Sequence, residues 1–477
     1  MALAKVLWVD DEIDSLRSQK IFLENKGYEV HTLTNGFDAI DYVKENIVDV
    51  VLIDESMPGI TGLETLAKIK EVNGAIPVVL ITKNETENLM DDAIGSQISD
   101  YLIKPVNPNQ VWLSLKKILD NRRLVAEKTT TAYQQQFRNL FMALNSNPDY
   151  NEWMGIYKEL VYWELSLQRS DSPEMQEVFQ TQKSEANTEF FKFVSRNYAS
   201  WLNPKTGDKP VMSHTLLKEK VLPHVEKGTP TFFVLIDNLR FDQWKSIQPI
   251  FAESFRVLQE ETFYSILPTA TQYARNAIFS GMLPIEIEKK FPQHWKNDED
   301  EGGKNLFEEE FLRANLKALG KGDLRVSYTK VLNNNAGLDL VNNMHNLLGN
   351  DLNVIVYNFV DMLSHARTEM EVLKELAGDE TSYRSVTTSW FEHSPLHTAL
   401  KKIADKNIKL IVGTDHGSVR VKTPAKVIGD KQTTTNLRYK HGKNLGFTEK
   451  DVYVVRKPER INLPKENIST AYVFALE

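Results

Sequence analysis

Short apolar runs alternate with helical patterns along the first quarter of the chain. Five such runs occur between residues 5 and 120, namely Val6–Val9, Tyr28–Leu33, Val48–Ile53, Ile76–Ile81 and Asp100–Ile103. Short strands that alternate with helices are typical of a parallel sheet whose crossover helices cover both faces. The pattern therefore predicts an α/β domain with a doubly wound, flavodoxin-like sheet.

From residue 107 to about residue 201 the apolar positions take a helical spacing instead. Bulky residues recur three or four positions apart, as at Trp153 and Tyr157. This spacing predicts a small helical bundle. An aromatic stripe on a helix is usually core, so we expect Trp153, Tyr162 and Trp163 to be packed inside the bundle rather than to stack on nucleic-acid bases.

In the second half of the chain, three apolar runs lead into side chains that can bind a metal: Phe232–Ile236 before Asp237, Val354–Val360 before Asp361 and His365, and Leu410–Thr414 before Asp415 and His416. Open α/β sheets place ligand groups at the carboxyl ends of their strands. Carboxylate and neutral imidazole are the ligands of a catalytic Zn²⁺ or Mn²⁺ site. Any one run could be an ordinary polar strand end, but three together predict a metal site.

A second pattern lies between these runs, in the segment Leu267–Asn276. Its Pro-Thr-x-Thr sequence leaves an apolar run and enters a helical pattern, which places the hydroxyl of Thr271 at a helix N-terminus. Backbone donors and the helix dipole favour a developing anion there. A threonine in this position is more often only an N-cap. The neighbouring metal-ligand runs favour a catalytic role over a capping role, and we predict that Thr271 is a nucleophile.

Length and composition limit the remaining possibilities. A chain of 477 residues predicts two or three domains, which we place at 1–120, 121–205 and 206–477. There is no cysteine, so a metal must take oxygen and nitrogen ligands. A net charge of −8 argues against broad non-specific DNA binding. The N-terminus has no signal-peptide pattern and no apolar stretch is long enough to span a membrane, so we expect a cytoplasmic protein.

Charged and hydroxyl residues follow the strands of the first domain. Asp10, Asp11 and Asp54 follow or end predicted strands, Thr82 follows the fourth run, and Lys104 comes directly after the fifth. Because these positions share one sheet edge, the carboxylates must recruit a cation, for which Mg²⁺ is the best candidate. A phosphoryl group on Asp54 would then be neutralised by that metal and by Lys104.

This arrangement resembles the receiver domain of bacterial response regulators. The resemblance implies the following assignments: Asp10 and Asp11 as the acidic metal-binding pair, Asp54 as phosphoacceptor and Mg²⁺ ligand, Thr82 and Tyr101 as switch residues, and Lys104–Pro105 as the family's switch lysine followed by a cis-proline. It also implies a sensor histidine kinase as partner and a homodimer formed on phosphorylation through the fourth and fifth helices. A flavodoxin-like domain with an acidic edge, or a receiver that no longer takes phosphate, are the alternatives.

The later motifs resemble, in order and type, the two-metal site of the alkaline phosphatase superfamily. The similarity is to its branch with a threonine nucleophile, and to the PglZ variant of the fold. It implies two Zn²⁺ ions, one held by Asp237, Thr271, Asp415 and His416 and the other by Asp361, His365 and His441. His393 is the alternative to His441 as the last ligand.

The order of the three domains resembles PorX-type response regulators, a family linked to type IX secretion. The implied activity is a zinc-dependent phosphodiesterase that acts on nucleotides or oligonucleotides and is controlled by the receiver. Alternatively, the PglZ-like domain is a non-catalytic binding module that contacts a sigma factor or a secretion-system component. The presence of Thr271 favours the enzyme, since a structural metal site needs no hydroxyl at that position.

Overall fold

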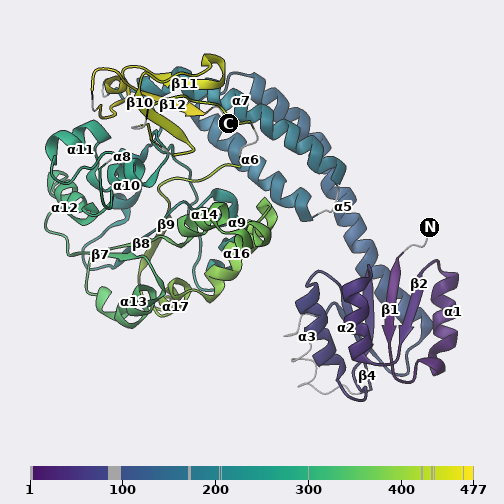
Figure 1. The fold of residues 1–477 in the computed structure, drawn as a ribbon. Helices are drawn as coiled ribbons and strands as arrows, with labels where there is room; N and C mark the ends of the chain where they lie inside the picture. The colour runs from purple at the N-terminus through teal and green to yellow at the C-terminus, as the bar shows by residue number, and fades with distance from the viewer. Residues whose placement is uncertain are drawn as a thin grey trace. The chain divides into compact units, whose positions relative to one another are not determined.

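The computed structural model describes residues 4–475 except 84–97, 170–172, 204, 206, 299, 421–422, 431–432, 435 and 466, and it leaves out the side chains of 120–127 and 451. The described chain divides into two compact units (Figure 1). The first extends to Ala132, and the second contains Tyr133–Gln168 and the residues from Pro173 onwards. Each unit is described by itself below.

The first unit is a parallel five-stranded sheet with the strand order β2-β1-β3-β4-β5. Its elements are β1 (Lys5–Val9), η1 (Ile13–Leu16), α1 (Arg17–Asn25), β2 (Glu29–Leu33), α2 (Gly36–Glu45), β3 (Val50–Asp54), α3 (Gly62–Val72), β4 (Val78–Thr82) and β5 (Asp100–Ile103). Every residue of β3 and β4 is buried, because apolar clusters cover both faces of the sheet. The predicted doubly wound sheet is confirmed, and its carboxyl edge carries the acidic residues.

The helical region contains three long helices: α5 (Pro108–Asn145), α6 (Tyr150–Arg169) and α7 (Pro173–Trp201). Trp153 and Trp163 are buried, as predicted. The same prediction is wrong for Tyr162, whose side chain is 61% exposed. The buried residues of α6 follow a single stripe that includes Trp163. Adjacent helical residues point about 100° apart, so Tyr162 falls outside that stripe.

The second unit is built on a parallel four-stranded sheet, ordered β7-β8-β6-β9, with a separate antiparallel sheet ordered β10-β12-β11. The strands are β6 (Thr231–Ile236), β7 (Val326–Val331), β8 (Leu352–Tyr357), β9 (Lys409–Gly413), β10 (Tyr439–Lys443), β11 (Val452–Val455) and β12 (Thr470–Ala475). The α-helices are α8 (Ser213–Leu216), α9 (Phe241–Ala252), α10 (Thr271–Ser280), α11 (Pro284–Lys290), α12 (Glu308–Ala318), α13 (Asn334–Leu347), α14 (Phe359–Glu369), α15 (Glu371–Leu376), α16 (Glu380–His393) and α17 (Pro395–Lys401). Short helical turns are η2 (Leu217–Val221), η3 (Leu222–His224), η4 (Glu449–Asp451) and η5 (Pro458–Ile461).

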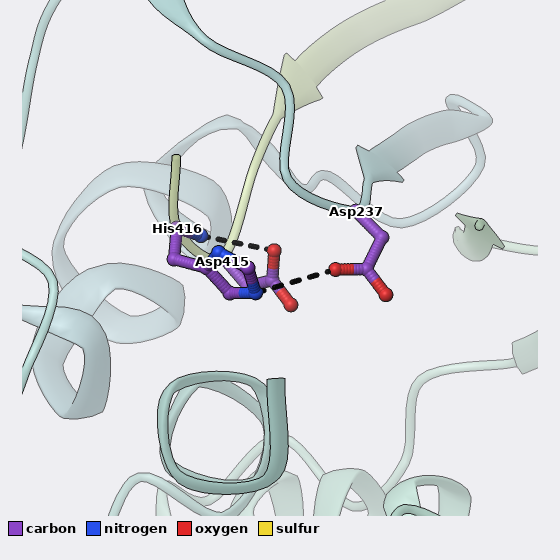
Figure 2. Close-up of side chains that lie close together, drawn as sticks. All are labelled: Asp237, Asp415 and His416. Carbon is purple, nitrogen blue, oxygen red and sulfur yellow. Dashed lines mark hydrogen bonds and ion pairs between the residues drawn. The ribbon is translucent and has the colours of Figure 1, made fainter. Parts of the chain in front are cut away.

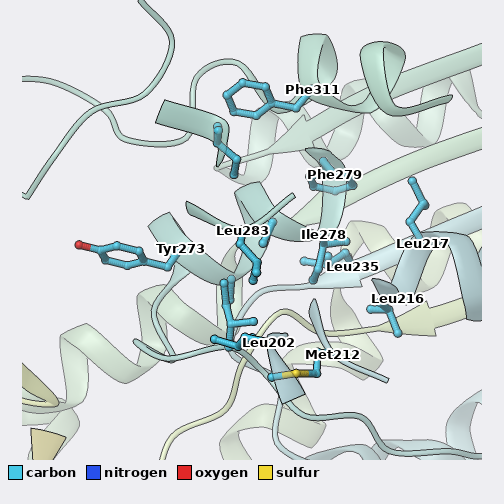
Figure 3. Packing of buried hydrophobic residues seen from close by; sticks show 14 of the residues in the cluster. Leu202, Met212, Leu216, Leu217, Leu235, Tyr273, Ile278, Phe279, Leu283 and Phe311 are labelled. Carbon is cyan, nitrogen blue, oxygen red and sulfur yellow. The ribbon is translucent and has the colours of Figure 1, made fainter. Parts of the chain in front are cut away.

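Strand β6 lies between β8 and β9, and all six of its residues are buried. Phe233 and Leu235 pack on the side of α10 and α12, where Figure 3 shows Leu235 near Ile278. Phe232 and Val234 pack on the opposite side, which α13 and α17 cover (Figure 1). Each fully buried Phe, Leu or Val side chain contributes about 1.5–3 kcal/mol. This double packing holds the carboxyl end of β6, where Asp237 follows, in a fixed place.

The described helices were also compared with the length and apolarity that a membrane span requires. None of them combines at least 18 residues with a sufficiently apolar stretch.

Candidate metal and phosphoryl-acceptor sites

The first site lies at the carboxyl edge of the receiver-like sheet. The Lys104 ammonium is 2.8 Å from Asp10 Oδ2 and 3.0 Å from Asp54 Oδ2. Ligand atoms of Asp10, Asp11 and Asp54 all lie within 4.8 Å of one another, and only Asp11 is exposed. Thr82 is buried at the end of β4. The structure therefore brings together the three carboxylates and the lysine that the sequence places at this edge.

The charge balance of this pocket leaves room for a cation. Burial raises the pKa of Asp54, and the hydrogen bond from Lys104 offsets only part of that increase. Burial lowers the pKa of Lys104, but the hydrogen bonds to Asp10 and Asp54 more than compensate and hold it above its ordinary value. Asp54 Oδ1 is buried and accepts no hydrogen bond from any described residue. Three carboxylates, one ammonium and an unsatisfied carboxylate oxygen fit a divalent cation with oxygen ligands.

The two predicted switch residues lie on neighbouring strands, Thr82 at the end of β4 and Tyr101 within β5. Tyr101 on β5 is 43% exposed, and the Lys104–Pro105 peptide bond is cis, as the receiver resemblance implies. The fourth helix predicted for dimerisation would follow Thr82 and falls within residues 84–97, outside the described part of the chain. The dimerisation surface therefore stays a prediction.

The second site lies at the carboxyl edge of the β7-β8-β6-β9 sheet. Asp237 follows β6, and Asp415 and His416 follow the neighbouring strand β9. Ligand atoms of these three buried residues lie within 4.8 Å of one another. His416 Nε2 is 3.6 Å from Asp237 Oδ1, and the backbone N–H of His416 donates to Asp415 Oδ1 at 2.9 Å, as Figure 2 shows. Three of the four residues predicted for one zinc ion therefore lie together.

The fourth predicted ligand, Thr271, lies at the same place. Its hydroxyl donates to Asp237 Oδ1 at 3.2 Å and is 3.0 Å from His416 Nε2. Thr271 is the first residue of α10, while Ala270 occupies the N-cap position. The hydroxyl thus faces the acidic cluster, and the first backbone N–H groups of the helix are close to it.

Asn238 connects this cluster to the third predicted strand end. Its backbone has a φ of 61°, a left-handed conformation that asparagine adopts more readily than other residues with a side chain. In this conformation its N–H donates to Asp415 Oδ1 at 3.2 Å, and its side-chain amide donates to Asp361 Oδ1 at 3.2 Å. One residue therefore ties the ends of β6 and β9 to helix α14.

A buried arginine, which sequence reasoning missed, supplies positive charge to the cluster. Arg275 Nη1 donates to Asp237 Oδ2 at 2.5 Å and lies 3.9 Å from Asp415 Oδ2. Its Nε donates to Glu308 on α12, and the side chains of both residues are at most 2% exposed. Arg275 lies one helical turn after Thr271 within an otherwise buried helix. That spacing is the only signal in the sequence that could have identified it.

Protonation states at this site follow from burial. Burial and the neighbouring charge of Asp415 raise the pKa of Asp237 to about 8, although Arg275 opposes the increase. Burial also raises the pKa of Asp415. Burial and the nearby Arg438 guanidinium lower the pKa of His416 to about 4, so its imidazole is neutral at pH 7. Neutral imidazole is the form that binds a metal.

The three residues predicted for a second zinc ion are not gathered in the same way. His365 Nε2 is 3.5 Å from Asp361 Oδ2, but its side chain is 69% exposed. His441 lies on β10, where Nδ1 is 3.8 Å from Asp298 Oδ2. Among the described residues, the only groups of three close ligand side chains are the two already named. The alternative ligand His393 is hydrogen-bonded to Ser389 O at 2.8 Å instead.

Within the second site, the residues around Asp237, here called the Asp237 half, fit a divalent metal. Asp415 Oδ2 is buried and accepts no hydrogen bond from any described residue. The two carboxylates and the neutral imidazole form a mixed oxygen and nitrogen ligand set, which suits Zn²⁺ in a site that keeps an open position. Asp237, Asp415, His416 and the Thr271 oxygen are the groups that would hold the ion.

Three protein-family models match the chain. The response regulator receiver domain matches residues 6–116, the PorX response regulator linker domain residues 123–202, and the BREX system PglZ alkaline phosphatase-like domain residues 216–473. Since the last match covers more than half of the chain, the protein belongs to the PglZ family of alkaline phosphatase-like domains. Together with the receiver and linker matches, this identifies the protein as a PorX-type response regulator. The predicted fold class is confirmed. Receiver and alkaline phosphatase-like domains generally bind divalent metals, and receivers in general take phosphate from histidine kinases.

Individual relatives resemble about a quarter of the chain. Transcriptional regulatory protein ZraR of Klebsiella oxytoca is 35% identical over 132 residues, which are 28% of this chain and 30% of ZraR. Transcriptional regulatory protein SrrA of Staphylococcus aureus is 30% identical over 24% of this chain and 47% of its own length. A CheY-like receiver domain protein from Methanospirillum hungatei JF-1, known from a crystal structure, is 26% identical over 25% of this chain and 96% of that chain, with a TM-score of 0.25. The chain thus matches less than half the length of these two curated relatives.

Proposed function

We propose that the protein is a cytoplasmic response regulator whose receiver controls a zinc-dependent phosphodiesterase. In this account a sensor histidine kinase phosphorylates Asp54 in the presence of Mg²⁺. The modified receiver forms a homodimer and thereby changes the activity of the PglZ domain. Nucleotides or oligonucleotides are the substrates, and the output regulates type IX secretion.

One observation carries the enzymatic part of the proposal. The Thr271 hydroxyl is within hydrogen-bonding distance of both Asp237 Oδ1 and His416 Nε2, two residues suited to metal binding. A threonine that served only as an N-cap would direct its oxygen to the backbone of its own helix. The oxygen of Thr271 instead faces the acidic cluster, which is the geometry of an activated nucleophile.

The chemistry would proceed in two displacements. The Thr271 oxygen attacks phosphorus, the bond from phosphorus to the leaving oxygen breaks, and the proton of the Thr271 hydroxyl ends on that leaving oxygen, which departs as the alcohol. Water then attacks the phosphothreonine and releases the phosphomonoester, so that Thr271 recovers its proton. Bound zinc supplies Lewis-acid stabilisation of the developing negative charge. Asp361, His365 and His441 would hold the second ion, which requires these three side chains to lie closer to one another than they do in this structure.

The Thr271→Ala variant tests this proposal. Hydrolysis of bis(p-nitrophenyl) phosphate by the zinc-loaded protein should fall by about 10²-fold or more, the general size of a missing catalytic group. Thr181→Ala, the same change on the exposed face of α7, should hydrolyse the diester at the parent rate. Equal rates for Thr271→Ala and the parent would leave the PglZ domain as a binding module for a sigma factor or secretion component.

A further inference from the structure

A buried chain of hydrogen bonds and ion pairs begins on linker helix α6. Arg384, on α16, has a side chain that is only 6% exposed. Its Nη2 donates to Gln168 Oε1 at 2.5 Å, and its Nη1 is 3.3 Å from Glu164 Oε1. The same Nη1 donates to Asp242 Oδ2 on α9 at 2.8 Å. One guanidinium therefore joins α6 to two helices that carry no linker sequence.

The chain continues to the loop that carries the metal ligand Asp237. Asp242 accepts two hydrogen bonds from Arg240, from Nε at 2.9 Å and from Nη2 at 2.6 Å. Such a bidentate pair fixes the orientation of both groups. Arg240 lies three residues after Asp237 and also forms an ion pair with Glu380. The position of the β6–α9 loop thus depends on the same charges that hold α6.

From Glu380 the chain reaches the helix that carries the other predicted metal ligands. Glu380 Oε1 accepts from Arg367 Nη2 at 3.1 Å. Arg367 is on α14, two residues after His365 and six after Asp361. The ring of Tyr383 lies under both guanidinium groups, 5.2 Å from that of Arg240 and 4.6 Å from that of Arg367.

The network is closed in the sense that its charges compensate one another. Burial raises the pKa of Asp242, but Arg240 and Arg384 outweigh it and hold that pKa below the ordinary value. Removing one partner from a buried ion pair leaves the other charge uncompensated, which is destabilising. A fully satisfied buried polar network makes the residues that form it rigid.

We infer that Glu164 and Gln168 of the linker are positioning residues for the zinc ligands, acting through Arg384 on the Asp237 loop and on helix α14. The inference rests on the proposed zinc site but not on its catalytic activity. The linker would then be part of the support of the site, and a displacement of α6 would change how the two ligand-bearing segments are presented.

Glu164 offers a matched pair of tests, because it has two ion-pair partners. Lys183 Nζ, on α7, is 2.6 Å from Glu164 Oε2, but Lys183 is not part of the network that leads to the zinc ligands. Arg384, the other partner of Glu164, is part of that network. Groups that hydrogen-bond a metal ligand directly typically change metal affinity by about 10–100-fold, and Arg384 acts at least one contact further away, so Arg384→Gln should weaken Zn²⁺ binding in chelator competition by about 10-fold at most. Lys183→Gln should bind Zn²⁺ as the parent does, even where both variants lower the thermal midpoint.

Hydrogen exchange in EDTA gives a readout that needs neither metal nor turnover. Peptides that contain Asp237–Arg240 and Asp361–His365 should exchange faster in Arg384→Gln than in the parent, but not in Lys183→Gln. Glu164→Gln, which leaves the Arg384–Asp242 pair in place, should show a smaller change in the same direction and serves if Arg384→Gln does not fold. Equal exchange and equal Zn²⁺ affinity in Arg384→Gln and Lys183→Gln would overturn the inference. A parent that binds Zn²⁺ but hydrolyses no diester would refute the proposed function while the exchange comparison still decides this point.

Discussion

The two acidic clusters of this protein are built in the same way, but a different cation balances the negative charge of each. In both, carboxylates follow the buried strands of a parallel sheet, and one buried carboxylate oxygen, Asp54 Oδ1 or Asp415 Oδ2, accepts no hydrogen bond among the described residues. In the receiver the internal cation is Lys104, whose side chain is 13% exposed. In the PglZ domain it is Arg275, which is 2% exposed and shared with Glu308.

This difference suits two kinds of chemistry. Lys104 is partly exposed and lies beside the exposed Asp11, so it could contact a phosphoryl group that is added to Asp54 and later removed, which suits the site to switching. A buried arginine that holds Asp237 Oδ2 leaves Oδ1 directed at Thr271 and His416, so the site is suited to repeated turnover in a fixed geometry. The same ligand chemistry thus supports a proposed phosphoryl-acceptor site in one unit and a proposed catalytic centre in the other.

The largest expected effect concerns Asp54. Asp54→Ala should abolish the mass increase that a small phosphodonor such as acetyl phosphate produces with Mg²⁺, because no other described carboxylate lies next to both Lys104 and the acidic pair. Asp41→Ala, an exposed carboxylate on α2, is the control and should be modified like the parent. Intact-protein mass spectrometry measures the mass gain. If Asp54→Ala gained the same mass as the parent, Asp54 would not be the phosphoacceptor and the proposed role of the receiver site would be wrong.

Arg275 and Lys104 should differ in what their removal costs. Arg275→Gln removes the cation that Asp237 and Glu308 share, so Asp237 loses that buried partner and Glu308 keeps only Lys330. A broken buried pair typically costs about 3–5 kcal/mol. Lys104→Gln should cost the receiver less, since water reaches the pocket beside Asp11. Urea unfolding that follows the two units separately gives both values in EDTA.

An exposed arginine provides the control for that comparison. Arg313 pairs with Glu309 on the surface of α12. The Arg313→Gln substitution should therefore change the unfolding free energy by no more than about 1 kcal/mol. If Arg275→Gln were no more destabilising than Arg313→Gln, the contrast between the two internal cations would be wrong.

Removing the metals should lower the stability of each unit by less than the loss of Arg275 does. A ligand present at a hundredfold excess over its Kd stabilises the folded state by about 2.7 kcal/mol. We expect Zn²⁺ to raise the unfolding midpoint of the PglZ unit and Mg²⁺ that of the receiver. Differential scanning calorimetry of the EDTA-treated protein with each metal checks this, and a Zn²⁺ shift that survives in Asp237→Asn would place the ion elsewhere.

The sequence was informative where chemistry follows strand ends. Parallel strands bring their carboxyl ends to one edge, so Asp10 and Asp54, or Asp237 and Asp415, could be placed together without a structure. Arg275 could not, because its contact with Asp237 depends on how α10 packs against the sheet. Nor could the position of His441, because β10 pairs with β12 in a sheet separate from the one that carries Asp237 and Asp415. The misplacement of Tyr162 contradicts the periodicity itself, because Tyr162 lies about half a turn away from Trp153 around α6 and so faces away from the buried stripe.

The zinc content of the purified protein tests the central claim most directly. Elemental analysis should find Zn²⁺ bound to the parent and retained by Thr271→Ala, since three protein ligands of the Asp237 half remain. His416→Ala should lose bound metal, because a side chain without a lone pair replaces a neutral imidazole ligand. A parent that carries no metal and takes up none from solution, or a His416→Ala variant that keeps the full complement, would contradict the account.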